Sequence, residues 1–175
     1  MSPAASPPAG WRADADRALA RGHRIDRLIP GFLLDSPISR VGYWYGNTVG
    51  WIWGTLWSTG PIERREGLWV FRGMPGWTFA RGGVCVGGCF LTGSGRVTDQ
   101  LLRHEGVHKR QWQRYGFLMP FLYLFAGRNP LRNRFEIEAG LEDGNYLPRG
   151  TASRPGIARA DGRRDAAAQR AVESP

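Results

Sequence analysis

Large apolar side chains are concentrated in the middle of the chain, and both ends are nearly free of them. Residues 1–10 and 149–175 consist mainly of Pro, Ala, Ser, Gly and Arg. Segments of this composition bury too little apolar surface to offset the entropy that is lost on ordering. We therefore expect disordered tails over residues 1–19 and 149–175, and one folded domain over residues 20–148.

A run of aromatic residues near the start of this domain is interrupted by regularly spaced glycines. Ser36 and Pro37 suit the N-cap and the first position of a helix. Glycine stands at positions 42, 46, 50 and 54. On a helix over residues 37–57 these glycines form one strip against which another element packs closely. The helix has no charge after Arg40, so three placements stay open: across a membrane, in its surface, or inside the protein under the sheet.

Short runs of β-branched and aromatic residues come next, separated by Gly and Pro turns. They lie at 68–72, 77–81 and 84–92 and predict two or three strands of a small sheet. A polar segment follows, which Thr98 or Asp99 can cap. It predicts a helix over residues 99–115 that directly follows the sheet.

Two further segments complete the predicted domain. Residues 117–127 are apolar but interrupted by Pro120, which predicts a buried connector or a short helix rather than a membrane span. A last helix is predicted over residues 130–146. A small sheet followed by helices indicates an α+β fold.

Charge and cysteine content narrow the classes of partner. The formal net charge of +9 is spread along the chain, and Lys109 is the only lysine. Nucleic-acid-binding modules usually concentrate their basic residues on one face, so we do not expect nucleic acid as a partner. Cys85 and Cys89 are too few for a disulfide framework or an iron–sulfur cluster. They are expected to be small buried residues of a strand.

The N-terminal segment lacks an apolar core after a basic start, so it does not read as a secretory signal. We therefore expect a cytoplasmic protein. Association with a membrane surface through residues 37–57 stays open as an addition to this expectation.

Two of the three histidines stand four positions apart in the stretch RHEGVHKRQ. On a helix, His104 and His108 point to the same side and can bind one metal ion. Glu105 occupies the position at which the glutamate of an HExxH motif holds the metal-bound water and takes its proton.

A catalytic zinc site needs a third protein ligand. The remaining histidine, His23, lies far upstream and is expected at the surface. The stretch FEIEAG in the last predicted helix supplies Glu136 and Glu138. At about 100° per residue these two glutamates cannot both face the metal squarely, and both stay open as the third ligand.

The combination of HEGVH, Gln111 and FEIEA resembles the gluzincin metallopeptidases, most closely the small single-domain minigluzincins, and more distantly the CAAX prenyl endopeptidases. By this resemblance Glu136 is the third ligand of Zn²⁺, with Glu138 as the alternative. Ala139 matches the alanine of the family's Glu-x-x-Ala-Asp run, and Gly140 stands where the family has aspartate. Asp143, one turn later, is the candidate to replace that aspartate.

The resemblance implies a zincin-like fold and hydrolysis of a peptide or protein substrate by a metal-activated water, with Glu105 as general base. An edge strand within 84–92 is expected to pair with that substrate. The candidates for supporting a ligand or stabilising the oxyanion are Gln111, Asp143, Tyr146, Tyr115 and Arg132. The alternative is a catalytically inactive scaffold that acts on a membrane surface or another protein through residues 37–57.

Overall fold

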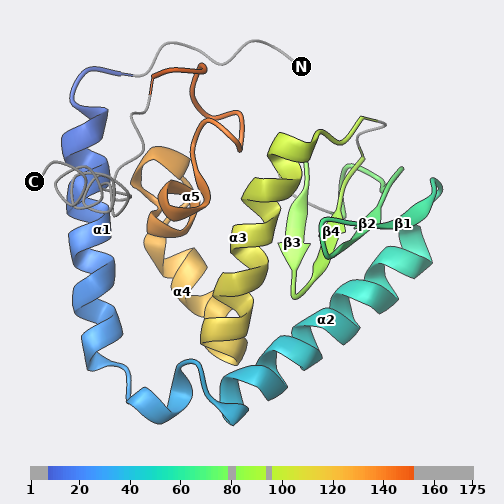
Figure 1. The fold of residues 1–175 in the computed structure, drawn as a ribbon, viewed down its shortest axis with the longest axis horizontal. Helices are drawn as coiled ribbons and strands as arrows, with labels where there is room; N and C mark the ends of the chain where they lie inside the picture. Colours follow the sequence, from blue (N-terminus) through green and yellow to red (C-terminus); the bar gives the residue numbers. More distant parts are fainter. Residues whose placement is uncertain (1–7, 79–81, 94–95, 152–175) are drawn as a thin grey trace, which may run out of the picture.

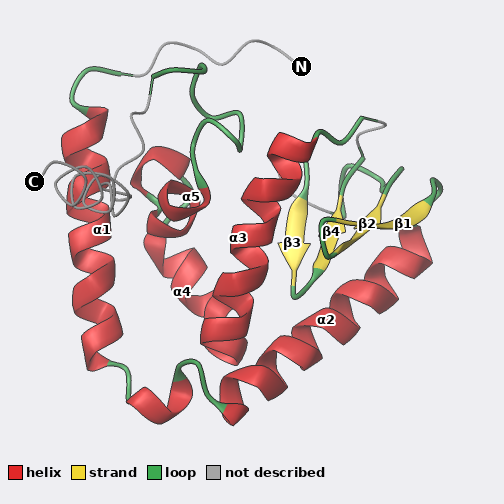
Figure 2. Ribbon diagram, in the orientation of Figure 1, coloured by secondary structure: helices red, strands yellow, loops and turns green. Residues whose placement is uncertain are grey.

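The computed structural model describes residues 8–78, 82–93 and 96–151. They form a mixed α+β domain, as predicted, in which one small sheet lies at one side of the molecule and is flanked by helices (Figures 1 and 2). The α-helices are α1 (Trp11–Leu28), α2 (Pro37–Trp57), α3 (Asp99–Tyr115), α4 (Met119–Ala126) and α5 (Arg134–Ala139). Short 3₁₀ turns are η1 (Gly31–Leu33), η2 (Gly116–Leu118) and η3 (Pro130–Arg132).

The sheet has four strands in the order β1-β2-β4-β3. They are β1 (Ile62–Arg65), β2 (Leu68–Phe71), β3 (Val84–Val86) and β4 (Cys89–Leu91). The central pair β2 and β4 is parallel, and the two outer pairs are antiparallel. Strand β3 is an edge strand and lies beside α3 in Figure 1.

The predicted strands differ from the observed ones in two places. Segment 84–92 forms a hairpin rather than one strand, because Gly87 adopts a left-handed φ of 61° and turns the chain. Strand β1 has the sequence IERR and was not predicted, since three of its four residues are charged. Residues 79–81 of the predicted strand 77–81 lie outside the described residues.

Helix α3 has the predicted bounds because local signals set both ends. The Thr98 side chain accepts a hydrogen bond from the Leu101 N–H, and Gly116 follows the last residue with a left-handed φ of 51°. One face of the helix packs Leu102 into the core formed with the sheet residues Leu68, Val70, Cys85 and Phe90. This packing fixes the rotation of α3, and His104 and His108 therefore face α5 instead of the sheet.

Helix α2 also has the predicted bounds, and Ser36 and Ser39 form a reciprocal capping box at its start. All four of its regularly spaced glycines are buried, which confirms the predicted packing strip. A Cβ on Gly42 would lie 2.2 Å from the Phe117 backbone nitrogen, and one on Gly54 would lie 2.5 Å from the Phe71 ring. Among the described residues no helix is both long and apolar enough to cross a membrane.

The N-terminal end of the predicted domain needs correction. Helix α1 includes residues 11–19, which were predicted to belong to a disordered tail. It is amphipathic, and Trp11 and Ala15 pack on Ile137 and Leu147 near the other end of the domain. Residues 1–7 and 152–175 lie outside the described part of the chain.

The predicted helix over residues 130–146 is shorter than expected. The Asn133 side chain caps α5, and the helix ends at Gly140, whose φ of 95° suits glycine but not a continuing helix. The predicted short helix within residues 117–127 is α4, but it is not buried. Phe121 and Phe125 are more than 70% exposed.

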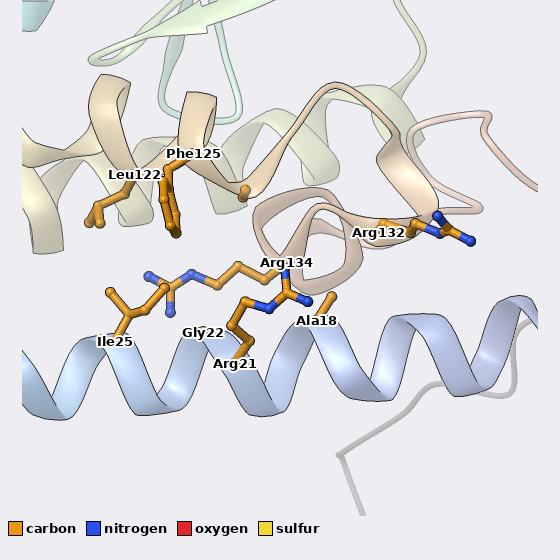
Figure 3. A pocket seen from close by; sticks show the side chains of 9 residues that line it. Ala18, Arg21, Gly22, Ile25, Leu122, Phe125, Arg132 and Arg134 are labelled. Atoms are coloured by element: carbon orange, nitrogen blue, oxygen red, sulfur yellow. The ribbon is translucent and has the colours of Figure 1, made fainter.

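Helix α1 packs against α5 at a point where α1 has no side chain. The Arg134 side chain lies over Gly22, and a Cβ at that position would come within 2.1 Å of the arginine Cδ (Figure 3). A cavity of about 30 Å³ remains between Ile25, Leu122 and this arginine. That volume is suited to one or two water molecules and is too small for a substrate.

Candidate metal centre

Helices α3 and α5 bring His104, His108 and Glu136 together. Their exposed fractions are 2%, 7% and 3%. The two histidine Nε2 atoms are 3.1 Å apart, and Glu136 Oε2 lies 3.2 Å from Nε2 of His104 and 3.6 Å from Nε2 of His108. One face of α3 and the first turn of α5 therefore point three ligand-type atoms at a common point.

The spacing of these atoms suits a tetrahedral ion. Ligands about 2.05 Å from a tetrahedral zinc ion are about 3.3 Å from one another, close to the three distances found here. Among the described residues, no hydrogen-bond donor in good geometry reaches the buried Glu136 Oε2. A buried carboxylate oxygen without a donor is costly, and a cation at the common point would satisfy it. The three residues could therefore hold a metal ion.

The partners of the two Nδ1 atoms fix the histidine tautomers. His104 Nδ1 lies 3.1 Å from the Gly140 carbonyl oxygen, which can only accept, so this nitrogen carries the proton. His108 Nδ1 lies 2.8 Å from Gln111 Oε1 and donates to it in the same way. Both Nε2 atoms are then free to present lone pairs to a metal. The Gly140 carbonyl fills the role for which Asp143 was the candidate.

Gln111 is held in this orientation by two acceptors. Its Nε2 donates to the Phe135 carbonyl oxygen at 3.1 Å and to Glu138 Oε2 at 3.0 Å. The amide oxygen must therefore face His108, because the amide nitrogen faces the two acceptors. Glu138, the alternative third ligand, thus reaches the site through Gln111 and does not join the three converging atoms.

Tyr123 of α4 is a further residue of the site that was not predicted. Its hydroxyl donates a hydrogen bond to Glu136 Oε1, which leaves Oε2 directed at the two histidines. Burial and the adjacent Glu136 charge together raise the pKa of Tyr123. The signal in the sequence was a single polar-tipped residue within the apolar run FLYLFA.

The electrostatic potential of the site is suited to a cation. Burial raises the pKa of Glu136, but the adjacent His104 and His108 outweigh this and lower it. Burial lowers the pKa of His108, but the adjacent Glu136 and Glu105 carboxylates reverse this and raise it. The carboxylates therefore favour a positive charge between the ligand atoms, whether a proton or a metal ion supplies it.

Glu105 lies between His104 and His108 in the sequence and is buried, with 6% of its surface exposed. Burial raises its pKa, while the neighbouring His108 and His104 act in the opposite direction. A carboxyl group with a raised pKa accepts a proton at neutral pH more readily than an ordinary glutamate does.

The other predicted residues take different positions. Asp143 pairs with Arg103 at 3.7 Å, the Tyr115 hydroxyl donates to Asp26 at 2.8 Å, and Arg132 pairs with Asp14. The Tyr146 ring lies edge-on to the His104 ring with centroids 5.9 Å apart. Of the three oxyanion candidates, Tyr146 thus borders the site. Tyr115, which is the last residue of α3, and Arg132 are engaged with α1 instead.

The segment after α5 covers His104 closely. A Cβ on Gly144 would lie 2.6 Å from His104 Cε1. A cavity of about 290 Å³ has a lining that includes His23, Gln111 and Glu138. Among the described residues that line it, none is one of the three converging ligands.

Comparisons with models of protein families, with curated proteins and with solved structures found no match to the chain. What this site can bind therefore follows from its own donor atoms and from the groups that hold them in place.

Proposed function

We propose that the protein is a zinc-dependent metallopeptidase of the gluzincin type, with a zincin-like fold. The observation that carries the proposal is the convergence of two imidazole nitrogens and one carboxylate oxygen at distances close to the edges of a zinc tetrahedron. His104, His108 and Glu136 would hold the ion. A bound zinc ion supplies Lewis acidity, which lowers the pKa of a water molecule and polarises the scissile carbonyl group.

The choice of zinc rests on the type of donor. Two histidines and one carboxylate form a mixed nitrogen and oxygen set, which zinc favours and which catalytic zinc sites use with a fourth position left for water. Calcium and magnesium prefer sets made of oxygen atoms alone. Zinc is therefore the ion that the donor set supports best.

The protein residues divide the remaining work. Glu105 takes a proton from the attacking water and passes it to the leaving amine, for which its raised pKa is suited. Gly140 and Gln111 keep the histidine tautomers in place. Tyr123 holds the second oxygen of Glu136.

The buried ligands place a condition on substrate entry. Because they are at most 7% exposed, a peptide reaches them only when the segment that carries Gly144 and Tyr146 moves away from His104. Strand β3, an edge strand beside α3, is the proposed partner of an extended substrate.

The proposal is tested by zinc content and peptide hydrolysis of the purified chain, with a library of quenched fluorescent peptides as the substrate. We expect about one zinc per chain and turnover in the wild type. Glu105→Gln should retain the zinc and lose at least about 100-fold in turnover, as general-base catalysis contributes that much or more. Glu66→Gln, an equal change of charge at an exposed position, is the matched control.

A wild type that remains empty in the presence of zinc would overturn the metal site. Unchanged turnover in Glu105→Gln would overturn the role of that residue. Zinc bound without any turnover would instead support the alternative, a catalytically inactive scaffold that works through helix α2.

A further inference from the structure

Helix α2 carries a second apolar stripe, separate from its glycine strip, and this one is exposed. Its members follow one another at spacings of three and four residues, which places them on one side of the helix. They are Ile38, Val41, Tyr45, Val49, Ile52 and Leu56, and their exposed fractions lie between 42% and 67%. Helix α2 forms an outer edge of the molecule in Figure 1.

The packing of the glycine strip keeps this stripe outside. At 100° per residue, the stripe lies roughly a quarter to a third of a turn away from the glycines. Gly42 is pressed against the Phe117 backbone, and Gly50 lies against Val86 and Cys89 of the sheet. Helix α2 cannot rotate its large apolar side chains inward, because that movement would separate these contacts.

The exposed apolar stripe of α2 continues onto the segment that forms η2 and α4. The rings of Tyr45 and Phe117 are 5.5 Å apart, and Phe117, Phe121 and Leu124 share one side of the segment that forms η2 and α4. The last two are each 71% exposed. We call the α2 stripe together with these three residues the apolar surface. Its side chains expose on the order of 800 Å², more than the roughly 300–600 Å² typical of the largest patch on a soluble monomer.

The polar groups beside the stripe are already satisfied inside the helix. The Thr48 hydroxyl donates to the Trp44 carbonyl oxygen at 3.0 Å, and the Thr55 hydroxyl donates to the Trp51 carbonyl oxygen at 2.8 Å. Neither hydroxyl loses a donated hydrogen bond when water is removed from this face. Such internal bonding suits a face that enters an apolar medium.

The remaining composition of α2 favours a lipid surface over a protein partner. Protein interfaces normally have a polar rim, whereas α2 carries no charge after Arg40. It is flanked instead by exposed tryptophans at positions 44, 51, 53 and 57. Tryptophan and tyrosine gather at the boundary between lipid and water. The net charge of +9 adds attraction to anionic lipids.

We propose that the apolar surface binds an anionic lipid bilayer, with α2 lying in the plane of the membrane surface. A helix in this position buries one face at the boundary between headgroups and acyl chains and does not cross the bilayer, in agreement with the length and apolarity of the described helices. The surface is formed by α2, η2 and α4 and includes none of the candidate metal ligands. The proposal is independent of zinc binding and of peptidase activity.

The experiment is flotation of the full chain with two kinds of vesicle, one of phosphatidylcholine alone and one of phosphatidylcholine with phosphatidylglycerol. The wild type should float with both and more strongly with the anionic vesicles. The test variants are Ile52→Glu and Phe121→Glu, each of which places one charge in the apolar surface. Each should weaken binding at least about tenfold. Circular dichroism checks that the variants are folded.

Ile62→Glu is the matched control, because it introduces the same charge at a 40% exposed apolar residue of β1, in the sheet that packs on the glycine side of α2. It should bind vesicles like the wild type. Equal binding by Ile52→Glu and the wild type would overturn the proposal, and so would a wild type that floats with neither vesicle. A dimer in light scattering that Ile52→Glu dissociates, without any vesicle binding, would overturn it too and would assign the surface to a second copy of the chain.

Discussion

Helices α3 and α2 depart from the usual distribution of polar and apolar side chains in opposite ways. Helix α3 buries His104, Glu105, His108 and Gln111 in the protein, although charged and polar residues are mostly exposed. Helix α2 buries four glycines and one serine and exposes its large apolar side chains. Buried polar groups on α3 and exposed apolar side chains on α2 each carry a cost in free energy, and each requires an interaction that offsets it.

The compensation differs between the two helices. At the buried face of α3, hydrogen bonds with Gly140, Gln111 and Tyr123 hold the histidines and Glu136 in place. One carboxylate oxygen of Glu136 has no donor and is directed at the two imidazole nitrogens. These three atoms have the spacing and the charge of a cation site. On α2, what is left over is an apolar surface far wider than any one ion, which suits a lipid surface. The form of the departure thus indicates the class of ligand.

The sharpest way to break this comparison is to remove the carboxylate oxygen that has no donor. Glu136→Ala should lower zinc affinity by more than about 100-fold, because it deletes a ligand, whereas loss of a supporting group costs about 10- to 100-fold. Glu138→Ala is the matched control on the same helix and should cost about tenfold, since it acts through Gln111. Zinc titration against a competing chelator measures both.

Equal losses in the two variants would contradict the division between ligand and supporting residue. A larger loss in Glu138→Ala would make Glu138 the third ligand and would require α5 to rotate from its position in the structure.

The parts of this site that were predictable from the sequence depend on local geometry. His104 and His108 share a side of α3 because four residues are close to one helical turn. The choice of Glu136 over Glu138 was open from the spacing, and only the resemblance favoured Glu136. The hydrogen bond from Tyr123 and the acceptor role of the Gly140 carbonyl depend on tertiary packing, and a backbone carbonyl leaves no trace in the residue types.

The same distinction applies to the fold. Helix α2 begins at the predicted residue because Ser36 caps it locally, and α3 has both of its predicted bounds because Thr98 caps its start and Gly116 follows its end. Strand β1 was missed because IERR gains its strand conformation only from pairing with β2. Helix α1 was partly assigned to a tail because Trp11 and Ala15 find their partners more than a hundred residues later.

The second prediction tests whether the glycine strip holds the apolar surface outward. Gly42→Ala should lower the free energy of unfolding by about 2 kcal/mol, because its Cβ would meet a backbone atom that cannot rotate away, and this cost exceeds the gain of about 1 kcal/mol in helix propensity. Urea denaturation measures the change. Gly106→Ala in α3 should instead raise stability by up to about 1 kcal/mol, since its nearest neighbour is the far end of the Arg110 side chain at 3.9 Å.

If Gly42→Ala were as stable as Gly106→Ala, α2 would not be locked against η2. Its exposed stripe could then turn toward the protein, and the contrast with α3 would lose its physical basis.

Helix α3 also carries a buried polar group that finds its partner within the protein and needs no ion, the hydroxyl of Tyr115. At the last turn of this helix, Asp26 of α1 accepts hydrogen bonds from Tyr115 and from Arg134, whose side chain is 4% exposed. Burial raises the pKa of Asp26, but these two hydrogen bonds outweigh it and hold the pKa below its ordinary value of 3.8. A lowered carboxyl pKa stabilises the fold above the ordinary value, and this contribution is lost as the pH falls through the lowered pKa.

Asp26→Asn should therefore lower the free energy of unfolding by about 1.5 kcal/mol at pH 7, which is less than the loss for a fully buried ion pair because Asp26 is partly open to solvent. The difference from the wild type should narrow as the pH falls below 3.8. Asp16→Asn, at an exposed position of the same helix, should change stability little both at pH 7 and below pH 3.8.

Zinc affinity should be the same in the wild type and in both variants, because the hydrogen bonds of Asp26 go to Tyr115 and Arg134 and not to His104, His108 or Glu136. A fall in zinc affinity for Asp26→Asn alone would show that the hydrogen-bonded group of Asp26, Tyr115 and Arg134 is coupled to the candidate metal centre.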